Sequence, residues 1–481
     1  MPMRISMLFL LTLLFNAQLT AQSNGPWTLQ RCIDEAFQKN IQIKQSELQV
    51  EFSEINQLQN KGAFLPTLNA SATHGYNWGQ TIDPFTNTFA TERIRSNSMG
   101  LGTGLTLFNG FQLVNSHKQG SIDIEVQKAN LEKMQNDIAL NVANAFLNVL
   151  FQEEFVAAAQ ANVTNTLQQV QRVENMVNAG AAPEGQLLEI KSQLANDEAA
   201  LVRSTNGLNM AYLNLRQLLL IPDSEADDFV ISRPPAGAVE GLLLPGNKQA
   251  AVSSALNSFP EIKSASASLQ SSLIGRKIAQ GNLYPRLNVN YSYGSGYSGA
   301  RVVPSGELIP AGTVPIGFIE GTNQLVVAPN FEYSGGFETK AFNAQIRDNV
   351  NQSLFFNLTI PIFNGFSTRS SIRRAEVSVK NAELTLELTK QQLRNAVELA
   401  YADALAALNS YRAAQQSVAA AELAFKYAEI RFTEGASNIA DFSAARARVD
   451  VARTELIRSK YDYIFRVKVV EFYMGQPLTL R

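Results

Sequence analysis

Apolar residues recur at alternating steps of three and four along one long stretch of the chain. The stretch follows Asn364-Gly365 and contains neither glycine nor proline until Gly435. This spacing is typical of a coiled coil, and alanines at several positions allow close helix approach. At about 1.5 Å per residue, such a helix extends on the order of 100 Å. The recurring positions are Ile372, Ala375, Val379, Ala382, Leu386, Leu393, Val397, Ala400 and Ala404.

The same unit occurs earlier in the chain. Asn109-Gly110 and Gly180 precede Asn364-Gly365 and Gly435 by the same number of positions. Equal displacement at both ends of so long a helix indicates a duplicated structural unit rather than an isolated coiled coil. Each long helix is followed by a return helix, which places helical hairpins at about 110–221 and 365–474.

Four shorter stretches alternate between apolar and polar residues along most of their length. They cover about 67–78, 97–108, 286–297 and 352–363, and each has the length and period of a transmembrane β-strand. A half-buried sheet of a soluble protein has the same period. A polar loop at 80–95 joins the first two strands, and a long loop at 298–350 joins the last two.

Helices are predicted before each pair of strands, at 27–61 and 248–280. The first ends at Gly62 and Pro66, and the second ends at Gly281 and Pro285. The fold class is therefore α+β, with a duplicated unit of helix, two strands, long helix and return helix. The first repeat covers 22–221, the second covers 248–481, and an acidic connector containing proline and glycine covers 222–247.

Residues 1–21 have the features of a secretory signal peptide. Arg4 supplies the positive charge, Met7 to Phe15 supply the apolar core, and Leu19-Thr20-Ala21 is a suitable cleavage site. A buried N-terminal segment is the alternative interpretation. Lysine and arginine total 40 against 42 aspartate and glutamate residues, so the charge balance gives no reason to expect nucleic-acid binding. Cys32, the single cysteine, is predicted to occupy an apolar core position.

Four strands cannot close a barrel, because about eight are the practical minimum. Open sheet edges are not tolerated in lipid, since unpaired backbone groups are too costly there. If the strands lie in a membrane, several copies of the chain must therefore share one barrel. Tyr76, Trp78, Tyr291 and Tyr293 are suited to its aromatic girdle.

Four features resemble the TolC-like outer-membrane efflux proteins. Ala63-Phe64-Leu65-Pro66 and Asn282-Leu283-Tyr284-Pro285 resemble the turn by which helices of that family enter the barrel. Leu105 to Gly110 and Leu358 to Gly365 resemble its strand-to-helix junctions. Trp27-Thr28-Leu29 resembles the start of its mature chain, and Gly180 and Gly435 stand where its helical hairpins turn.

The resemblance covers essentially the whole mature chain and implies several properties. It implies a homotrimer with a shared 12-stranded barrel and a periplasmic α-helical tunnel, in the outer membrane of a Gram-negative bacterium. The implied partners are a periplasmic adaptor protein, an inner-membrane transporter and outer-membrane lipid. The junction residues that carry these expectations are Pro66, Pro285, Asn109, Gly110, Asn364 and Gly365.

The two hairpin tips are candidate contacts for the adaptor protein. They comprise Gly180, Ala181, Ala182 and Pro183 in the first repeat and Gly435, Ala436, Ser437 and Asn438 in the second. Ordinary turn chemistry explains the same residues, because glycine ends helices and asparagine or serine caps them. The two interpretations are compatible.

Asp441 is a candidate pore constriction, because the resembled family places an acidic residue there, near the closed end of its tunnel. A ring of one aspartate per chain would attract cations. Alternatively, Asp441 is a solvated acid in the first turn of a helix, where the helix dipole favours negative charge. Ala444 stands one turn later and Gln186 stands at the equivalent position of the first repeat, so an acidic gate would depend on Asp441 alone.

No catalytic, cofactor-binding or metal-binding set is predicted. Gly294 to Gly299 matches a dinucleotide-binding pattern by letter, but a proline-containing segment follows it instead of a helix. His74 and His117, the two histidines, lie on different predicted elements.

The predicted function is a passive outer-membrane exit duct of a tripartite efflux system, not an enzyme. The exit duct of a type I protein secretion system shares this architecture and is the nearer alternative. A periplasmic coiled-coil scaffold is a more distant one, and a hydrolase is disfavoured because its residue constellation is missing.

Overall fold

The computed structural model describes residues 25–83, 85–87, 89–90, 93–226, 228–233 and 246–479. The predicted signal peptide at 1–21 lies outside the described residues, as does residue 227 and the 234–245 part of the predicted connector. The chain divides into two compact units. One combines Glu54–Ile122 with Gln270–Lys380, and the other holds the remaining described residues.

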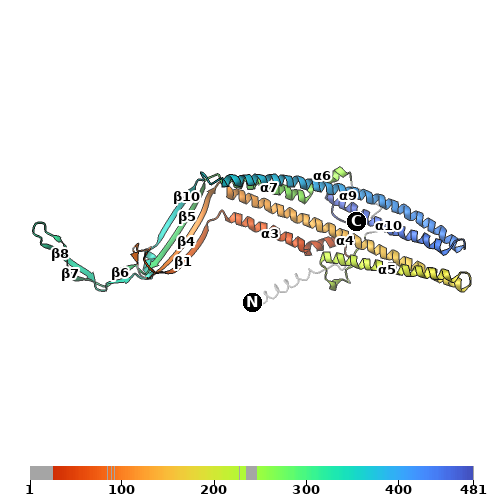
Figure 1. Ribbon diagram of the computed structural model, residues 1–481, viewed down its shortest axis with the longest axis horizontal. Coiled ribbons are helices and arrows are strands. Elements are labelled where there is room, and N and C mark those ends of the chain that lie inside the picture. The colour runs from red at the N-terminus through yellow and green to blue at the C-terminus, as the bar shows by residue number, and fades with distance from the viewer. Residues whose placement is uncertain are drawn as a thin grey trace, which may run out of the picture. The chain divides into compact units, whose positions relative to one another are not determined.

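The first of these units contains a four-stranded antiparallel sheet (Figure 1). Its strands are β1 (Thr67–Asn77), β4 (Ile94–Asn109), β5 (Arg286–Ser298) and β10 (Asn351–Thr359), hydrogen-bonded in the order β1-β4-β5-β10. The two central strands, β4 and β5, come from different repeats, so the sheet joins the repeats. Among the described residues, no further strand pairs with the outer edges of β1 and β10.

The two faces of the sheet differ in polarity. Opposed residues on one face include Ala70, Leu101 and Tyr293, and this face continues through Leu354 and Phe356 on β10. The other face carries mainly small and polar residues, which the register brings together in rows. They include Asn69, Ser71, Gly100, Gly102, Asn288, Asn290, Ser292 and Ser353.

Three sequence predictions about this unit are wrong in detail. The region 298–350 is not one long loop, because it contains β6 (Val302–Pro304), β7 (Leu308–Phe318), β8 (Leu325–Tyr333), β9 (Phe337–Thr339) and α8 (Phe342–Asp348). The loop at 80–95 holds a small hairpin of β2 (Thr81–Ile82) and β3 (Phe89–Ala90), and β4 already begins at Ile94. The fourth strand ends at Thr359 rather than 363, shortly before Pro361, which has no N–H to donate.

The helices before the strands are each broken once, whereas the sequence predicted two continuous helices. Asn40 separates α2 (Leu29–Lys39) from α3 (Ile41–Gly62), and its side-chain oxygen accepts hydrogen bonds from the backbone N–H groups of Gln42 and Ile43. Phe259 separates α6 (Lys248–Ser258) from α7 (Pro260–Gly281). Phe259 is extended, since a following proline disfavours the helical conformation.

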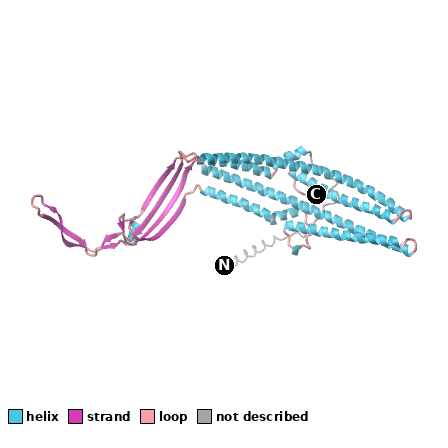
Figure 2. Cartoon of the chain, viewed as in Figure 1, coloured by secondary structure: helices cyan, strands magenta, loops and turns pink. Residues whose placement is uncertain are grey.

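Two helical hairpins complete the chain (Figure 2). The first consists of α4 (Gln112–Asn178) and α5 (Glu184–Leu219), and the second consists of α9 (Ser367–Thr433) and α10 (Ile439–Tyr473). Helices α4 and α9 each have 67 residues. This equality is what the duplicated glycine and asparagine positions predicted.

The larger apolar core lies where α2, α4, α5 and α10 meet. Cys32 is fully buried within it, which confirms the predicted core position. After the short helix η1 (Asp223–Glu225), the start of the predicted connector returns to this core. Phe229 and Ile231 are buried there, and Ile231 forms a parallel β-bridge with Trp27.

Candidate functional site

The two hairpin tips have matching backbone geometry. Gly180 and Gly435 have φ values of +72° and +70°, a conformation that glycine adopts without strain. The amides of the next residues, Ala181 and Ala436, donate to the carbonyls of Met176 and Arg431 at 2.8 and 2.7 Å. These bonds satisfy carbonyls that the helix ends leave free. At each tip the small residues are exposed or half-buried, so both tips offer accessible surface.

Asp441 is exposed in the first turn of α10. Its backbone N–H donates to the side chain of Asn438, the helix cap, at 2.8 Å, and its carboxylate accepts from the Ser437 hydroxyl at 3.3 Å. The structure therefore gives Asp441 the local role of a first-turn acid.

A compact aromatic cluster joins the two hairpins just below the tips. Phe442 of α10 stacks against Phe432 of α9 with ring centroids 5.0 Å apart, and Phe425 packs on the same ring. Val173 and Ile190 from the first hairpin complete the cluster. The relative position of the tips is thus fixed by buried apolar contacts.

A buried polar network lies farther along the same helices. Arg446 of α10 is 6% exposed, and its guanidinium lies 3.5 Å from the carboxylate of Asp197 on α5. It also donates to the backbone carbonyl of Asn162 on α4 at 2.8 Å. Asp197 additionally accepts from Thr166 and Gln193. Sequence reasoning missed this network, because Arg446 and Asp197 look like ordinary charges on helix surfaces.

The helix-to-strand junctions of the two repeats use the same hydrogen bonds. The amides of Phe64 and Leu65 donate to Lys61 and Gly62, and those of Leu283 and Tyr284 donate to Gln280 and Gly281. Pro66 and Pro285 follow directly and lead into β1 and β5. In each junction, these bonds from residue i to residue i−3 form a tight turn that ends the helix. The proline that follows then favours extended backbone.

The strand-to-helix junctions also match. Gly110 and Gly365 have φ values of +66° and +60°, and the phenylalanines that follow them are in the left-handed region as well. The Asn109 and Asn364 side chains accept from backbone amides in the first turns of α4 and α9. In both, the two phenylalanine rings that flank the Asn-Gly pair meet edge to face.

The surroundings of these two junctions differ. A side-chain carbon added at Gly110 would lie 2.2 Å from the Gly281 carbonyl oxygen, so the first strand-to-helix junction is packed tightly against the second helix-to-strand junction. The corresponding positions at the other ends, Gly365 and Gly62, have nothing within 4 Å. The duplication gives each chain two such pairs of junctions. Within one chain, the pair with Gly110 and Gly281 is in contact, whereas the equivalent positions Gly365 and Gly62 have no close neighbour.

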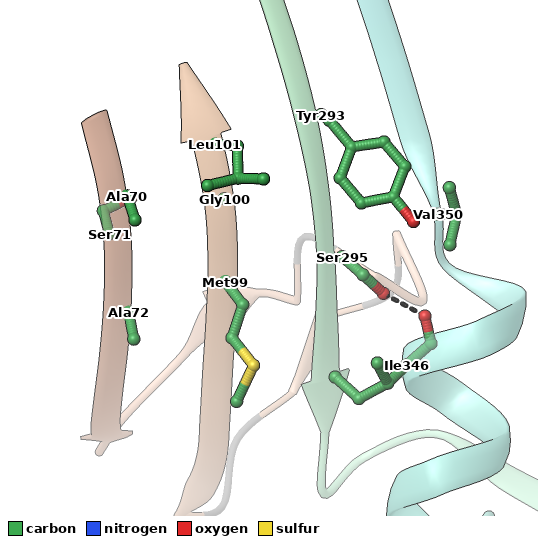
Figure 3. A pocket seen from close by; sticks show the side chains of 10 residues that line it. All are labelled: Ala70, Ser71, Ala72, Met99, Gly100, Leu101, Tyr293, Ser295, Ile346 and Val350. Atoms are coloured by element: carbon green, nitrogen blue, oxygen red, sulfur yellow. Dashed lines mark hydrogen bonds between the residues drawn. The ribbon is translucent and has the colours of Figure 1, made fainter. Parts of the chain in front are cut away.

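A groove lies on the apolar face of the sheet beside α8 (Figure 3). Its volume is about 500 Å³. Alanines of β1 form one side, Met99 and Leu101 of β4 lie along it, and Tyr293 with Ile346 of α8 forms the other side. The Ser295 hydroxyl donates to the Ile346 carbonyl and ties the helix to β5. Sequence reasoning missed the groove because it placed a loop where α8 lies.

Two negative findings concern the described part of the chain. It contains no group of three or more histidine, cysteine, aspartate or glutamate side chains arranged to hold a metal ion. Among its helices, none combines the length and the apolar character needed to cross a membrane.

The fold is that of outer-membrane channels of known structure. The Campylobacter jejuni CmeC outer-membrane channel superposes with a TM-score of 0.72 at 15% sequence identity, covering 93% of this chain and 85% of CmeC. The chain therefore shares the fold of this structural class.

The sequence gives the family. The profile of the outer membrane efflux protein family matches residues 32–219 and 251–476, and the chain belongs to that family. Similar relatives include the outer membrane efflux protein BepC of Brucella suis, 20% identical over 453 residues, with 94% of this chain and 86% of BepC covered. Vibrio cholerae TolC is 24% identical over 476 residues, with 95% and 93% covered. The predicted family, fold, outer-membrane location and efflux role are thereby confirmed.

Proposed function

We propose that three copies of this chain form a passive exit duct in the outer membrane. An inner-membrane transporter would deliver small molecules through a periplasmic adaptor protein, and the duct itself would perform no chemistry. Three copies of the four-stranded sheet would give a 12-stranded barrel without open edges. The polar sheet face would line its interior, and the apolar face would contact lipid.

The half-made junction contact carries this proposal. Gly110 packs on Gly281 within one chain, whereas their repeat equivalents Gly365 and Gly62 are open. The sheet has the same asymmetry, since β4 pairs with β5 but their equivalents β10 and β1 have free edges. A second copy that offers Gly62 and β1 to the first copy's Gly365 and β10 would complete both contacts. Such head-to-tail interfaces close into rings.

The duplication also specifies the register of the missing strand pair. Thr103 pairs with Tyr291 between β4 and β5, and the equivalent residues on β10 and β1 are Leu358 and Ala72. Leu358 of one copy should therefore stand opposite Ala72 of the next. Directly opposed residues in an antiparallel sheet have side chains about 4.5–5.5 Å apart. Cysteines at the two positions would then form a disulfide between copies.

The experiment combines mass and cross-linking. Wild-type protein extracted in mild detergent without heating should have the mass of three chains. The double variant Leu358→Cys, Ala72→Cys should give covalent dimers and trimers on oxidation, while the mismatched pair Leu358→Cys, Leu68→Cys should give few. Both variants need Cys32→Ala as background. A membrane-embedded single chain, or equal cross-linking of both pairs, would overturn the proposed ring.

The tips and Asp441 are assigned roles in the same duct. Exposed small residues at both tips, held by the aromatic cluster beneath them, are suited to contact an adaptor protein. Asp441 is exposed near the second tip, where three copies would place a ring of carboxylates at the periplasmic end. Such a ring would favour cations and narrow the pore.

A further inference from the structure

We propose that the groove beside α8 binds an acyl chain of an anionic, phosphate-bearing lipid from the outer leaflet of the membrane. The inference rests on the proposed function, because the apolar sheet face contacts lipid only in the closed ring. The site would be repeated in every copy of the chain.

The shape of the groove is suited to a hydrocarbon chain. Ala70 and Ala72 leave space on the outer face of β1, next to larger side chains on β4 and β5. The volume of about 500 Å³ lies within the range of small-molecule sites, about 300–1,000 Å³. In the proposed ring, the exposed Leu358 of the next copy would stand beside Ala72 and extend the apolar wall. The groove would therefore continue across the contact between copies.

Helix α8 is a fixed wall rather than a loosely attached segment. Gln345 is fully buried, its amide donates to the Ser298 and Lys340 carbonyls at 2.9 and 2.8 Å, and its oxygen accepts from the Ser298 amide at 3.0 Å. The Phe342 ring packs on Tyr297 with centroids 5.4 Å apart. These contacts hold Ile346 against the groove without any bound molecule, so little ordering is needed when a chain enters.

Positive charge lies at the α8 side of the groove. Arg347 is exposed and directly follows Ile346, and Arg301 donates to Asn349, which directly precedes the lining residue Val350. Lys340 forms an ion pair with Asp348, so this acid is already matched by a lysine. Arg347 and Arg301 also interact with Asp348, but three cations stand against this one acid, so the group keeps a net positive charge that attracts an anionic headgroup. Arginine suits phosphate through its planar set of donors.

The position along the sheet agrees with this assignment. Tyr76, Trp78 and Tyr297 stand nearer to the loop end of the strands than the groove does, and Arg93 and Arg95 lie over the rings of Tyr76 and Tyr297. Aromatic residues of this kind concentrate at the headgroup level. An acyl chain in the groove would then lie just inside the hydrocarbon layer, with its headgroup near the arginines.

Native mass spectrometry of the detergent-extracted protein tests the proposal. The probes are a diphosphorylated hexa-acyl lipid A and zwitterionic phosphatidylethanolamine at equal concentration. Ala72→Trp fills the groove, and Ile346→Ala removes part of its wall without adding bulk. Leu68→Trp is the matched control, because Leu68 lies on the same strand and face but does not line the groove.

We expect wild type and Leu68→Trp to retain lipid A, and Ala72→Trp and Ile346→Ala to retain it about 10-fold less. Arg347→Gln should weaken lipid A binding but leave phosphatidylethanolamine binding unchanged. Equal retention by Ala72→Trp and Leu68→Trp, or equal wild-type binding of the two lipids, would overturn the proposal. The same spectra report the chain number, so an intact trimer without selective lipid binding contradicts only this inference, whereas a single chain contradicts the proposed ring.

Discussion

The guanidinium of Arg446 lies 3.5 Å from the carboxylate of Asp197, and this buried ion pair joins the second helical hairpin to the first. The two residues are 249 positions apart in the sequence, and their side chains are only 7% and 9% exposed. Asn162, Thr166 and Gln193 form further hydrogen bonds to the pair. The two hairpins are therefore held together by buried polar contacts. Removing one partner would leave the other buried without its counter-charge, which destabilises the fold.

Arg446→Met should destabilise the helical hairpins strongly. Removing one partner of a buried ion pair leaves an uncompensated charge, which costs about 3–5 kcal/mol. Arg453→Met is the matched control, because Arg453 lies on the same helix and pairs with Glu422 where both side chains are nearly half exposed. Such a pair contributes about 0–1 kcal/mol. Thermal unfolding followed by the helical circular-dichroism signal measures both, and similar midpoints would contradict the prediction.

Asp441→Ala should raise single-channel conductance or reduce cation preference. The change removes one negative charge per copy from the proposed constriction, so the pore loses its local attraction for cations. Glu184→Ala is the control, since Glu184 is an exposed acid in the first turn of α5. Planar-bilayer recordings of both variants provide the measurement. If Asp441→Ala changes neither quantity, the gate role is wrong and only the role of a first-turn acid is left.

Gly365→Ala should lower the dissociation temperature of the oligomer as much as Gly110→Ala does. Of these two glycines, only Gly110 has a close neighbour in the single chain. Equal effects therefore require that another copy packs against Gly365. Gly336→Ala controls for backbone strain, because Gly336 has a φ of +68° and open surroundings. The three variants are heated in detergent, and the temperature at which each oligomer dissociates is compared. Gly365→Ala should lower the dissociation temperature clearly more than Gly336→Ala, and equal effects of these two would count against the ring.

The fold at the loop end of the sheet should weaken in acid. Burial opposes ionisation of Asp83, but hydrogen bonds from the Ser298 hydroxyl and from the backbone amides of Thr86 and Phe85 outweigh it, so the pKa of this carboxyl lies below its ordinary value of 3.8. A depressed folded-state pKa gives stabilisation that is complete above the ordinary value and is lost as the pH falls through the folded value. The protection of amides near Asp83, measured against the intrinsic exchange rate at each pH, should therefore fall below about pH 4. In Asp83→Asn exchange should be faster at neutral pH and change less with acidification; an unchanged acid response would exclude Asp83 as its source.

Cys32 should resist alkylation in the folded protein. Burial raises the pKa of its thiol to about 12, the neighbouring Arg31 opposes this rise, and Glu35 adds to it. The thiolate is the reactive form, so little of it is present at pH 8. Iodoacetamide labelling followed by mass spectrometry should be at least about 100-fold slower than after unfolding. Ala436→Cys, at an exposed tip, provides the reactive reference in the same molecule.

The duplication allowed much of the fold to be predicted from sequence. The Asn-Gly pairs and the tip glycines mark both ends of the long helices because left-handed backbone at those points favours glycine. The four strands of the main sheet were recognisable because apolar and polar residues alternate along most of their length, whereas the short strands in the two predicted loops were missed. The breaks at Asn40 and Phe259 were missed, since each interrupts a helical pattern for one residue only.

The functional details were less accessible for physical reasons. Helix α8 has seven residues, too few for a 3.6-residue period to be visible, so the groove could not be anticipated. The pairing of Arg446 with Asp197 depends on how two hairpins pack, which local sequence does not encode. The tip residues and Asp441 were recognised from the family resemblance, and the bilayer recordings of Asp441→Ala test the role of the aspartate.

The central strand pair also has a consequence for the order in which the molecule matures. Thr106 and Asn288 bond to each other across β4 and β5 although 182 positions separate them. Closing so long a loop is slow, and the whole first hairpin must leave the export machinery before its sheet partner exists. Until then the edge of β4 that β5 will cover is unpaired, and such an edge favours aggregation. The interval between the export of β4 and the arrival of β5 is therefore the stage at which the new chain is most exposed to mispairing.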